Sequence, residues 1–283
     1  MTIDLVPLSP SVGAEIRGLD LARDLDAATF DQIRAAWAVH KVLLIRGQTI
    51  DADQQLRFAR RFGEIQVVRS ATHILGEQQA IMHVANREVA GKPGILPDGE
   101  MQFHTDQCYY ERPSRLTMLY AMEIPKQGGN TLFLNAAAAF AALPATRQAD
   151  LAKLQVHQVY DYDGSPTIKS GDVRADAPHF IHPLVIRHPE TGAPVLYANR
   201  LMSERIVGLD GAESDRLLAE LFDHMEQRRF IYEHVWRVGD LLFWDNLAVM
   251  HARTDFDPAE ARILRRVTVA GARPEPAALG TAA

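Results

Sequence analysis

The chain has 283 residues, of which 47% are hydrophobic and 23% are charged. These are ordinary values for globular proteins, and they exclude a disordered, collagen-like or coiled-coil chain. The formal net charge of -6 leaves no basic excess to neutralise a nucleic-acid backbone, so we expect no nucleic-acid partner. No secretory signal is visible, and no apolar run approaches the roughly 18 residues that a membrane span needs. Cys108 is the single cysteine, which fits a reducing compartment, so we expect a cytoplasmic protein without a membrane partner.

Few segments carry hydrophobic residues at helical spacing. Asp51 is the expected N-cap of one helix and Gly63 its expected C-cap, because a short polar side chain and a glycine suit these positions. Asn135 is expected to cap a further short helix that stops before Pro144. The predicted amphipathic helices cover residues 29–39, 52–62 and 213–228.

The remaining apolar segments are short and separated by turn residues, which is typical of strands. Strands do not alternate regularly with helices, so a doubly wound parallel sheet is disfavoured. We predict a mostly antiparallel β core, a sandwich or a jelly roll, with flanking helices. No linker divides the chain, so residues 1–283 are expected to form a single domain whose tail, from Arg273, frays. The predicted strands lie at 42–46, 80–85, 116–121, 131–134, 156–160, 184–187, 195–198, 232–237, 240–244 and 263–270.

Three histidines are followed two residues later by an acidic residue, and local structure must decide between the pairs. His224 and Glu226 lie in the predicted helix at 213–228, where residues two apart diverge. His188 and Glu190 bracket a proline in what looks like an exposed hairpin loop. His104 and Asp106 lie in a strand-like aromatic segment, where both side chains can face one cavity. This last pair alone has the geometry for two metal ligands.

A third ligand is needed to complete such a site. Two histidines and one carboxylate on one face of Fe(II) leave open positions for a co-substrate and O2. We favour His251, which is expected in a loop at the end of the apolar strand 240–244. His157, His179 and His182 remain as competing third ligands.

Two arginines share one face of the predicted strand 263–270. Alternation places Arg262, Leu264 and Arg266 together, and turns Arg265 to the other face. A guanidinium binds a carboxylate or a sulfonate through two parallel, charge-assisted hydrogen bonds. This face is therefore predicted to bind anions if it lies beside the metal, whereas on a solvated edge strand it would only form surface ion pairs.

Together these residues resemble the Fe(II)/2-oxoglutarate-dependent taurine dioxygenase family, which includes the aryloxyalkanoate herbicide dioxygenases. The order and spacing of the matching blocks are more specific than any single block. The blocks are VGAEIRGLDL (12–21), LLIRGQ (43–48), FARRFGEI (58–65), HTD (104–106), GGNTLF (128–133), HPLV (182–185), HPETG (188–192) and WDNLAVMHA (244–252), followed by Arg262 and Arg266.

The resemblance implies a double-stranded β-helix, or jelly roll, that hydroxylates a small anionic substrate with Fe(II), 2-oxoglutarate and O2. It implies that His104, Asp106 and His251 are the iron ligands. Thr131 and Arg262 would bind the distal carboxylate of 2-oxoglutarate. The implied substrate is a sulfonate, a sulfate ester, an aryloxyalkanoate or another carboxylate, and cleavage of a C–O or C–S bond would follow if the hydroxylated carbon bears the heteroatom.

The resemblance also bears on the substrate side of the site. It implies that Arg266 meets the anionic group of the substrate. The positions that contact taurine in a taurine dioxygenase are Val68 and Glu100 here, where that enzyme has histidine and asparagine, which argues against taurine as the substrate. Tyr109 contacts the substrate only if the chain bends after Asp106, because a regular strand would turn it away.

Three alternatives stay open at this point. A non-catalytic, cupin-like protein that binds a metal or a small anion would share the fold but would not need the pair Thr131 and Arg262. A metal-dependent hydrolase would need a general base beside a metal-bound water. A family member acting on a cationic substrate would not need Arg266. A homo-oligomer is compatible with helices on one side of such a core, and the sequence does not decide the oligomeric state.

Overall fold

The structure is a computed structural model that describes residues 2–66, 80–89, 91, 94, 100–161, 173–174 and 176–278. The helices in this part are α1 (Ala27–His40), α2 (Ala52–Arg60), α3 (Ala136–Ala141), α4 (Ala145–Leu151), α5 (Gly211–Met225) and the 3-10 helix η2 (Arg228–Phe230). The strands are β1 (Asp4–Pro7), β2 (Ala14–Arg17), β3 (Val42–Ile45), β4 (Met82–Ala85), β5 (Met101–His104), β6 (Ser114–Glu123), β7 (Thr131–Asn135), β8 (Gln155–Val159), β9 (His179–Pro183), β10 (Val185–Arg187), β11 (Pro194–Leu196), β12 (Ser203–Ile206), β13 (Ile231–His234), β14 (Leu241–Asp245), β15 (Val249–Arg253), β16 (Ile263–Ala270) and β17 (Glu275–Pro276). None of the described helices is long and apolar enough to cross a membrane.

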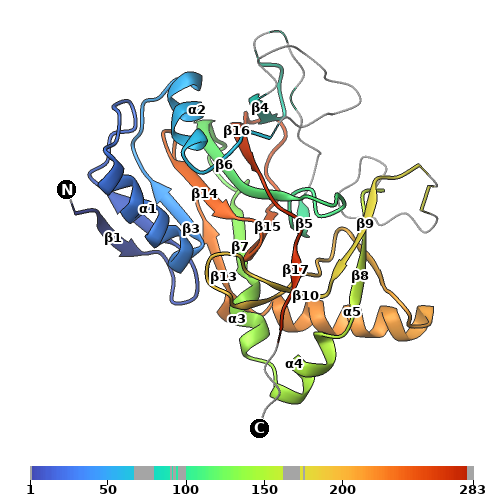
Figure 1. The fold of residues 1–283 in the computed structure, drawn as a ribbon. Helices are drawn as coiled ribbons and strands as arrows, with labels where there is room; N and C mark the ends of the chain where they lie inside the picture. Colours follow the sequence, from blue (N-terminus) through green and yellow to red (C-terminus); the bar gives the residue numbers. More distant parts are fainter. Residues whose placement is uncertain are drawn as a thin grey trace.

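Two sheets dominate the fold (Figure 1). The larger has the strand order β1-β2-β3-β14-β6-β16-β4, and the smaller has the order β13-β7-β15-β5. Two further three-stranded sheets have the orders β12-β8-β9 and β11-β10-β17. Among the described strands, every ladder except β2–β3 is antiparallel. The prediction of a mostly antiparallel β protein with few helices is confirmed.

The larger sheet buries both of its faces. Along β14, Leu241 and Phe243 pack into a cluster with the apolar residues of α1 and α2. Leu242 and Trp244 alternate to the other face, where they pack with Phe133 of the smaller sheet. The interior between the two sheets is therefore a separate layer from the core beneath α1 and α2.

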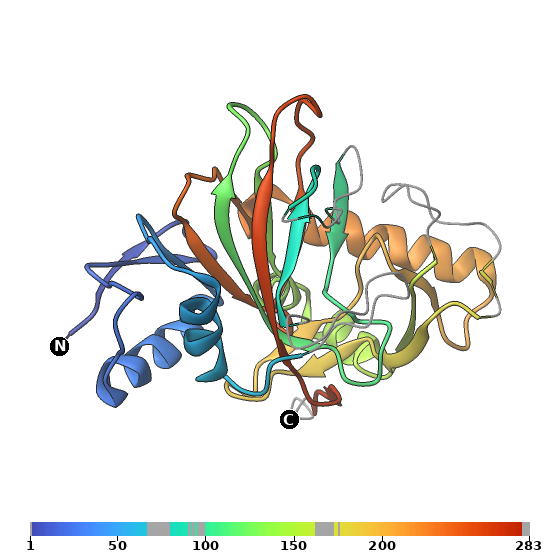
Figure 2. The same ribbon diagram turned by 90° about the horizontal axis from the view of Figure 1, so that it is seen from above.

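The smaller sheet is covered on its outer face by the second group of helices. Leu134 and Met250 pack there with residues of α3 and α5. Figures 1 and 2 show α1 and α2 (blue) on one side of the molecule and α5 (orange) on the other. Inward-facing residues of β7, β15 and β16 thus line an interior that helices shield from both sides.

The helix ends agree with the sequence in three places and differ in one. Asp51 accepts a hydrogen bond from the backbone N–H of Gln54 and forms a capping box with it, and Asn135 caps α3. However, α2 ends at Arg60, before the expected Gly63. The helix that Asn135 caps stops before Pro144 as expected, because α3 ends at Ala141 and Pro144 is the N-cap of the separate helix α4.

The C-terminal tail does not fray from Arg273 as expected. Residues of β17 pair with β10, and Ala277 is buried in the cluster beneath α3 and α5. The prediction of a loose tail over 273–283 is therefore wrong for the described part of it, since ladder hydrogen bonds and apolar burial hold the chain through residue 277.

Candidate metal centre

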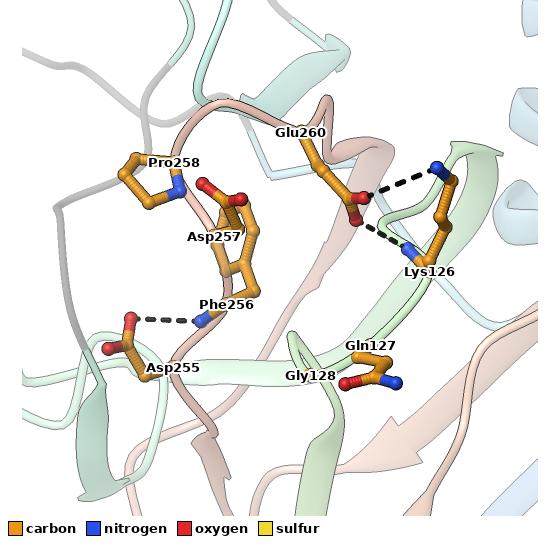
Figure 3. A pocket seen from close by; sticks show the side chains of 8 residues that line it. All are labelled: Lys126, Gln127, Gly128, Asp255, Phe256, Asp257, Pro258 and Glu260. Atoms are coloured by element: carbon orange, nitrogen blue, oxygen red, sulfur yellow. Dashed lines mark hydrogen bonds and ion pairs between the residues drawn. The ribbon is translucent and has the colours of Figure 1, made fainter.

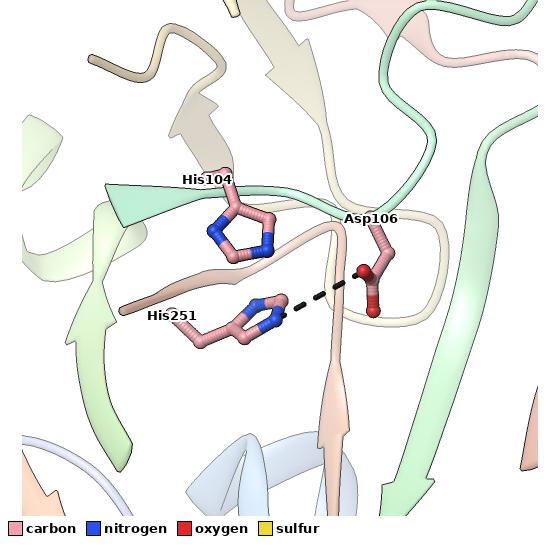
Figure 4. A group of neighbouring side chains, drawn as sticks. All are labelled: His104, Asp106 and His251. Atoms are coloured by element: carbon pink, nitrogen blue, oxygen red, sulfur yellow. Dashed lines mark ion pairs between the residues drawn. The ribbon is translucent and has the colours of Figure 1, made fainter. Parts of the chain in front are cut away.

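His104, Asp106 and His251 converge on one point (Figure 4). One potential ligand atom from each of the three residues lies within 4.8 Å of the others. The rings of His104 and His251 have centroids 4.0 Å apart, and Nε2 of His251 lies 3.9 Å from Oδ1 of Asp106. All three side chains are largely buried. The spatial convergence predicted for these residues is therefore present.

The local structure that produces this convergence differs from the predicted one. His104 is the last residue of β5, and Asp106 lies in the turn that follows rather than on the same strand. Gln107 has φ of 58°, which reverses the chain there. His251 lies in the middle of β15, not in a loop, and pairs with His104 across the β15–β5 ladder. Strand pairing thus brings the two imidazoles together, and the turn brings in the carboxylate.

Hydrogen bonds orient His104, which ends β5, and Asp106, which begins the turn. Nδ1 of His104 lies 2.9 Å from the carbonyl oxygen of Gln102 and donates to it, which leaves Nε2 for a metal. The Thr117 hydroxyl donates to Oδ2 of Asp106 at 2.5 Å. Asn246 in turn donates from Nδ2 to the Thr117 oxygen at 2.9 Å. Thr117 and Asn246 were not predicted, because nothing in their spacing along the chain relates them to Asp106.

The electrostatics keep the three ligands in the protonation states that a metal needs. Burial raises the pKa of Asp106, but Arg266, followed by His251, His104 and the Thr117 hydroxyl, outweighs burial and lowers the pKa to about 2. Burial is also the main reason why the pKa of His104 is lowered and that of His251 is lowered well below its usual value. An ionised carboxylate and two neutral imidazoles suit a divalent transition metal.

The other histidines considered as third ligands take part in other contacts. Nδ1 of His157 pairs with Glu204, Nδ1 of His179 lies beside the carbonyl of Ala177, and Nε2 of His182 lies beside that of Tyr110. The described residues that gather around His104 and Asp106 include His251 and none of these three.

The rejected pair His188 and Glu190 has a different role from the expected one. His188 is fully buried rather than exposed in a hairpin loop, because its Nε2 pairs with Asp245 at 2.8 Å. These three side chains also lie close enough to hold an ion, but Arg115 forms ion pairs with both Asp245 and Glu190. The guanidinium supplies the positive charge there, so the group is an ionic network in which Arg115, His188 and Asp245 are buried and Glu190 is exposed.

Thr131 and Arg262 lie on the interior side of the two sheets. The Thr131 oxygen accepts a hydrogen bond from Nε1 of Trp236 at 3.0 Å, so its own hydroxyl hydrogen can be donated elsewhere. Nε of Arg262 donates to the Gly129 carbonyl at 2.9 Å. Nη1 of Arg262 is buried without a hydrogen-bond partner in the described structure. Burial, and after it Arg253, lowers the pKa of Arg262 to about 9.

Arg266 contacts the candidate metal ligand Asp106, and its charge acts on Tyr109. Nη2 of Arg266 pairs with Oδ1 of Asp106 at 2.8 Å, and its Nε is buried without a hydrogen-bond partner in the described region. The predicted alternation is confirmed, because Arg265 points away and donates to Gln55 of α2. A turn follows Asp106, so Tyr109 is not directed away by strand alternation, and its ring packs 4.7 Å from that of Tyr160.

Burial, followed by neighbouring Tyr160 and Tyr110, raises the pKa of Tyr109 well above its usual value, and Arg266 acts in the opposite direction. The phenol is therefore neutral and within the field of that guanidinium. Of the two positions expected to distinguish this chain from a taurine dioxygenase, Glu100 is exposed and Val68 lies outside the described residues.

A separate depression of about 640 Å3 lies at the loop between β15 and β16 (Figure 3). The depression is lined by residues 126–128, 255–258 and 260. None of the metal ligands lines it, and Glu260 is already engaged with the backbone N–H and the ammonium group of Lys126. The depression is therefore distinct from the metal centre.

Two imidazoles and one carboxylate, held between two antiparallel sheets, form the ligand set of the non-haem Fe(II) oxygenases. The chain belongs to the family described as "Taurine catabolism dioxygenase TauD, TfdA family", whose model matches residues 4–268. The protein is an Fe(II)- and 2-oxoglutarate-dependent dioxygenase. This membership favours the catalytic interpretation over a non-catalytic binder or a hydrolase.

Similar proteins cover almost the whole chain. It is 33% identical to pentalenolactone F synthase of Streptomyces avermitilis, over 94% of this chain and 93% of that protein. It is 32% identical to the (S)-phenoxypropionate/alpha-ketoglutarate-dioxygenase of Sphingobium herbicidovorans, over 95% of each. Among solved structures, a putative alpha-ketoglutarate-dependent taurine dioxygenase from Burkholderia xenovorans matches with a TM-score of 0.82 at 30% identity, over 96% of this chain and 94% of that one.

Proposed function

We propose that this protein hydroxylates a small anionic organic molecule, with His104, Asp106 and His251 holding Fe(II). The observation that carries the proposal is the convergence of these three side chains within 4.8 Å. We propose further that residues 1–283 form one domain with the double-stranded β-helix, or jelly-roll, arrangement. The two antiparallel sheets that face each other across a common core support this arrangement.

The donor set fits the cofactor. A carboxylate with a pKa of about 2 and two buried imidazoles with lowered pKa offer one anionic and two neutral ligands, which suit Fe(II). When bound, Fe(II) with 2-oxoglutarate and O2 supplies oxidative decarboxylation of the co-substrate and hydroxylation of a substrate C–H bond.

Thr131 and Arg262 are proposed to bind the distal carboxylate of 2-oxoglutarate. Among the described residues, the hydroxyl hydrogen of Thr131 and Nη1 of Arg262 are two donors that are available to a ligand. A buried guanidinium nitrogen without an acceptor costs free energy, which a carboxylate at this place offsets.

Arg266 and Tyr109 are proposed to bind the primary substrate. Arg266 lies beside the metal ligand Asp106, and its side chain is 18% exposed, so an anion can reach it. The rings of Tyr109, Tyr110 and Tyr160 pack side by side and offer an apolar surface. A sulfonate, a sulfate ester, an aryloxyalkanoate or another carboxylate fits this arrangement. A C–O or C–S bond is cleaved when the hydroxylated carbon bears the oxygen or the sulfur.

The guanidinium and the aromatic surface position the target C–H bond near the metal. Positioning of this kind contributes several kcal/mol to catalysis. We also propose a cytoplasmic location, which is supported by Cys108 being a free, buried thiol in a chain with no other cysteine.

The test is a panel of anionic compounds incubated with Fe(II), ascorbate and 2-oxoglutarate, in which substrate-dependent formation of succinate is measured. We expect at least one sulfonate, sulfate ester or aryloxyalkanoate to stimulate succinate formation. With that compound, Arg266→Ala should raise the KM for the substrate at least tenfold and change the KM for 2-oxoglutarate less than threefold. Arg23→Ala, at an exposed arginine paired with Asp20, is the matched control. An unchanged substrate KM in Arg266→Ala would refute the role given to Arg266.

A further inference from the structure

We propose that Arg253 is a second guanidinium at the co-substrate site and binds the distal carboxylate of 2-oxoglutarate together with Arg262. The inference rests on the proposed function, because it needs that carboxylate to lie beside Thr131. It adds a binding residue that the sequence did not single out, since Arg253 follows His251 in a segment that was expected to be a loop.

The first argument is the strand register. In the β15–β7 ladder, His251 pairs with Phe133 and Arg253 pairs with Thr131. Residues two apart on a strand share a face, and Phe133 faces the interior between the sheets. Arg253 therefore extends from the same face as the metal ligand His251, about 7 Å further along the strand. That spacing is comparable to the length of a five-carbon dicarboxylate.

The second argument is the meeting of two buried arginines. Arg253 and Arg262 are 6% and 2% exposed; Arg253 lies on β15 of the smaller sheet, and Arg262 directly precedes β16 of the larger sheet. Nε of Arg262 donates to the carbonyl of Gly129, two residues before Thr131, and Thr131 is the ladder partner of Arg253; after burial, the charge of Arg253 also lowers the pKa of Arg262. Two like charges in a buried region repel each other, and an anion between them removes this penalty. Nη1 of Arg262 lacks a hydrogen-bond partner in the described structure, which marks where the anion binds.

The third argument is the close packing of Gly128 and Gly129 against Arg262 and the loop after β15. Gly129 has φ of 63°, and a Cβ there would lie 3.0 Å from Cδ and Nε of Arg262. A Cβ on Gly128 would lie 2.3 Å from the carbonyl oxygen of Asp255. The two glycines therefore let Arg262 and the loop after β15 pack against the start of β7. The Arg253 guanidinium also lies over the ring of Phe256 in that loop, which fixes its direction.

The experiment compares two ligands that differ only in the distal carboxylate. Binding of 2-oxoglutarate and of 2-oxopentanoate to the Mn(II)-loaded protein is measured by calorimetry without O2, so that no turnover is required. We expect Arg253→Gln to weaken the binding of 2-oxoglutarate at least tenfold and that of 2-oxopentanoate less than twofold. The affinity of Arg253→Lys for 2-oxoglutarate should lie between those of wild type and Arg253→Gln. Equal weakening of both ligands, or of neither, would overturn the proposal.

Wild-type protein and Arg262→Gln separate this inference from the proposed function. If wild-type protein binds both ligands equally, the distal-carboxylate site itself is absent and the proposed function fails. In the second case, wild-type protein prefers 2-oxoglutarate and Arg262→Gln loses this preference. If Arg253→Gln and Arg253→Lys then keep the preference, only the role of Arg253 is refuted. Arg253→Lys retains the charge and serves as the folded test variant if Arg253→Gln does not fold.

Discussion

The hydroxyl group of Thr117 offers a sharp test of how the protein holds its metal. In Thr117→Val the shape of the side chain is kept, but Oδ2 of Asp106 loses its donor and Nδ2 of Asn246 loses its acceptor. A hydrogen bond to a charged group contributes about 1.5–3 kcal/mol. Because a factor of ten corresponds to about 1.4 kcal/mol, we expect Mn(II) to bind about 10- to 100-fold more weakly, as is typical when a group that orients a ligand is removed.

The assay is calorimetric titration of metal-free protein with Mn(II), together with urea unfolding of the same samples. Thr117→Ser keeps the hydroxyl and is the matched control, so its Mn(II) affinity should stay within about threefold of wild type. A loss of stability alone would also follow from the unsatisfied Asn246 amide, which is why the affinity is the deciding quantity. Mn(II) affinity within twofold of wild type in Thr117→Val would refute the idea that this hydroxyl positions Asp106.

Three further predictions follow from the same structure. In wild-type protein, Mn(II) at one hundred times its Kd should raise the free energy of unfolding by about 2.7 kcal/mol. His104→Ala should still unfold cooperatively, but Mn(II) should not raise its free energy of unfolding. If Mn(II) stabilises the variant as much as wild type, His104 is not a metal ligand. Burial raises the pKa of Asp245, but Arg115 and then His188 outweigh it and lower the pKa to about 2. This pKa lies below the unfolded value of about 3.9, so the carboxylate stabilises the fold above pH 4 and loses that effect as the pH falls toward 2. Asp245→Asn should therefore be less stable than wild type by about 2 kcal/mol at pH 7. The difference in the free energy of unfolding, measured with urea, should be smaller at pH 3. The same difference at both pH values would contradict this. Burial raises the pKa of the Cys108 thiol to about 12, so native protein should resist alkylation by iodoacetamide at pH 8 and react only in denaturant, and rapid labelling of native protein would disprove it.

Much of the sheet architecture could be predicted because its central strands are short apolar runs bounded by turn residues. The strand predicted at 263–270 matches β16 in both bounds, and the opposite directions of Arg265 and Arg266 follow from its period of two. The convergence of His104 with Asp106 also followed from local spacing, although a turn rather than a strand produces it.

Other features depend on contacts that spacing along the chain does not reveal. β15 was missed because two of its three inward positions carry His251 and Arg253, and only Val249 is apolar; polar residues on the inward face hide the pattern of a buried strand. His188 was expected to be exposed, since the proline and glycine around it signal a turn, but the partner that buries it, Asp245, is 57 residues away. Distance in sequence likewise separates Thr117 from Asn246.

Asp245 and Asn246 are neighbours in sequence, yet each belongs to a different network. Asp245 joins Arg115 and His188 in the ionic network. Asn246 donates a hydrogen bond to the Thr117 hydroxyl, which in turn donates to Asp106. Substitutions at these two adjacent positions are therefore expected to have different effects, at Asp245 on the stability of the fold and at Asn246 on the orientation of Asp106. Tyr109 belongs to neither network, and its ring packs instead against those of Tyr110 and Tyr160, so substitutions there are expected to act on the proposed substrate surface.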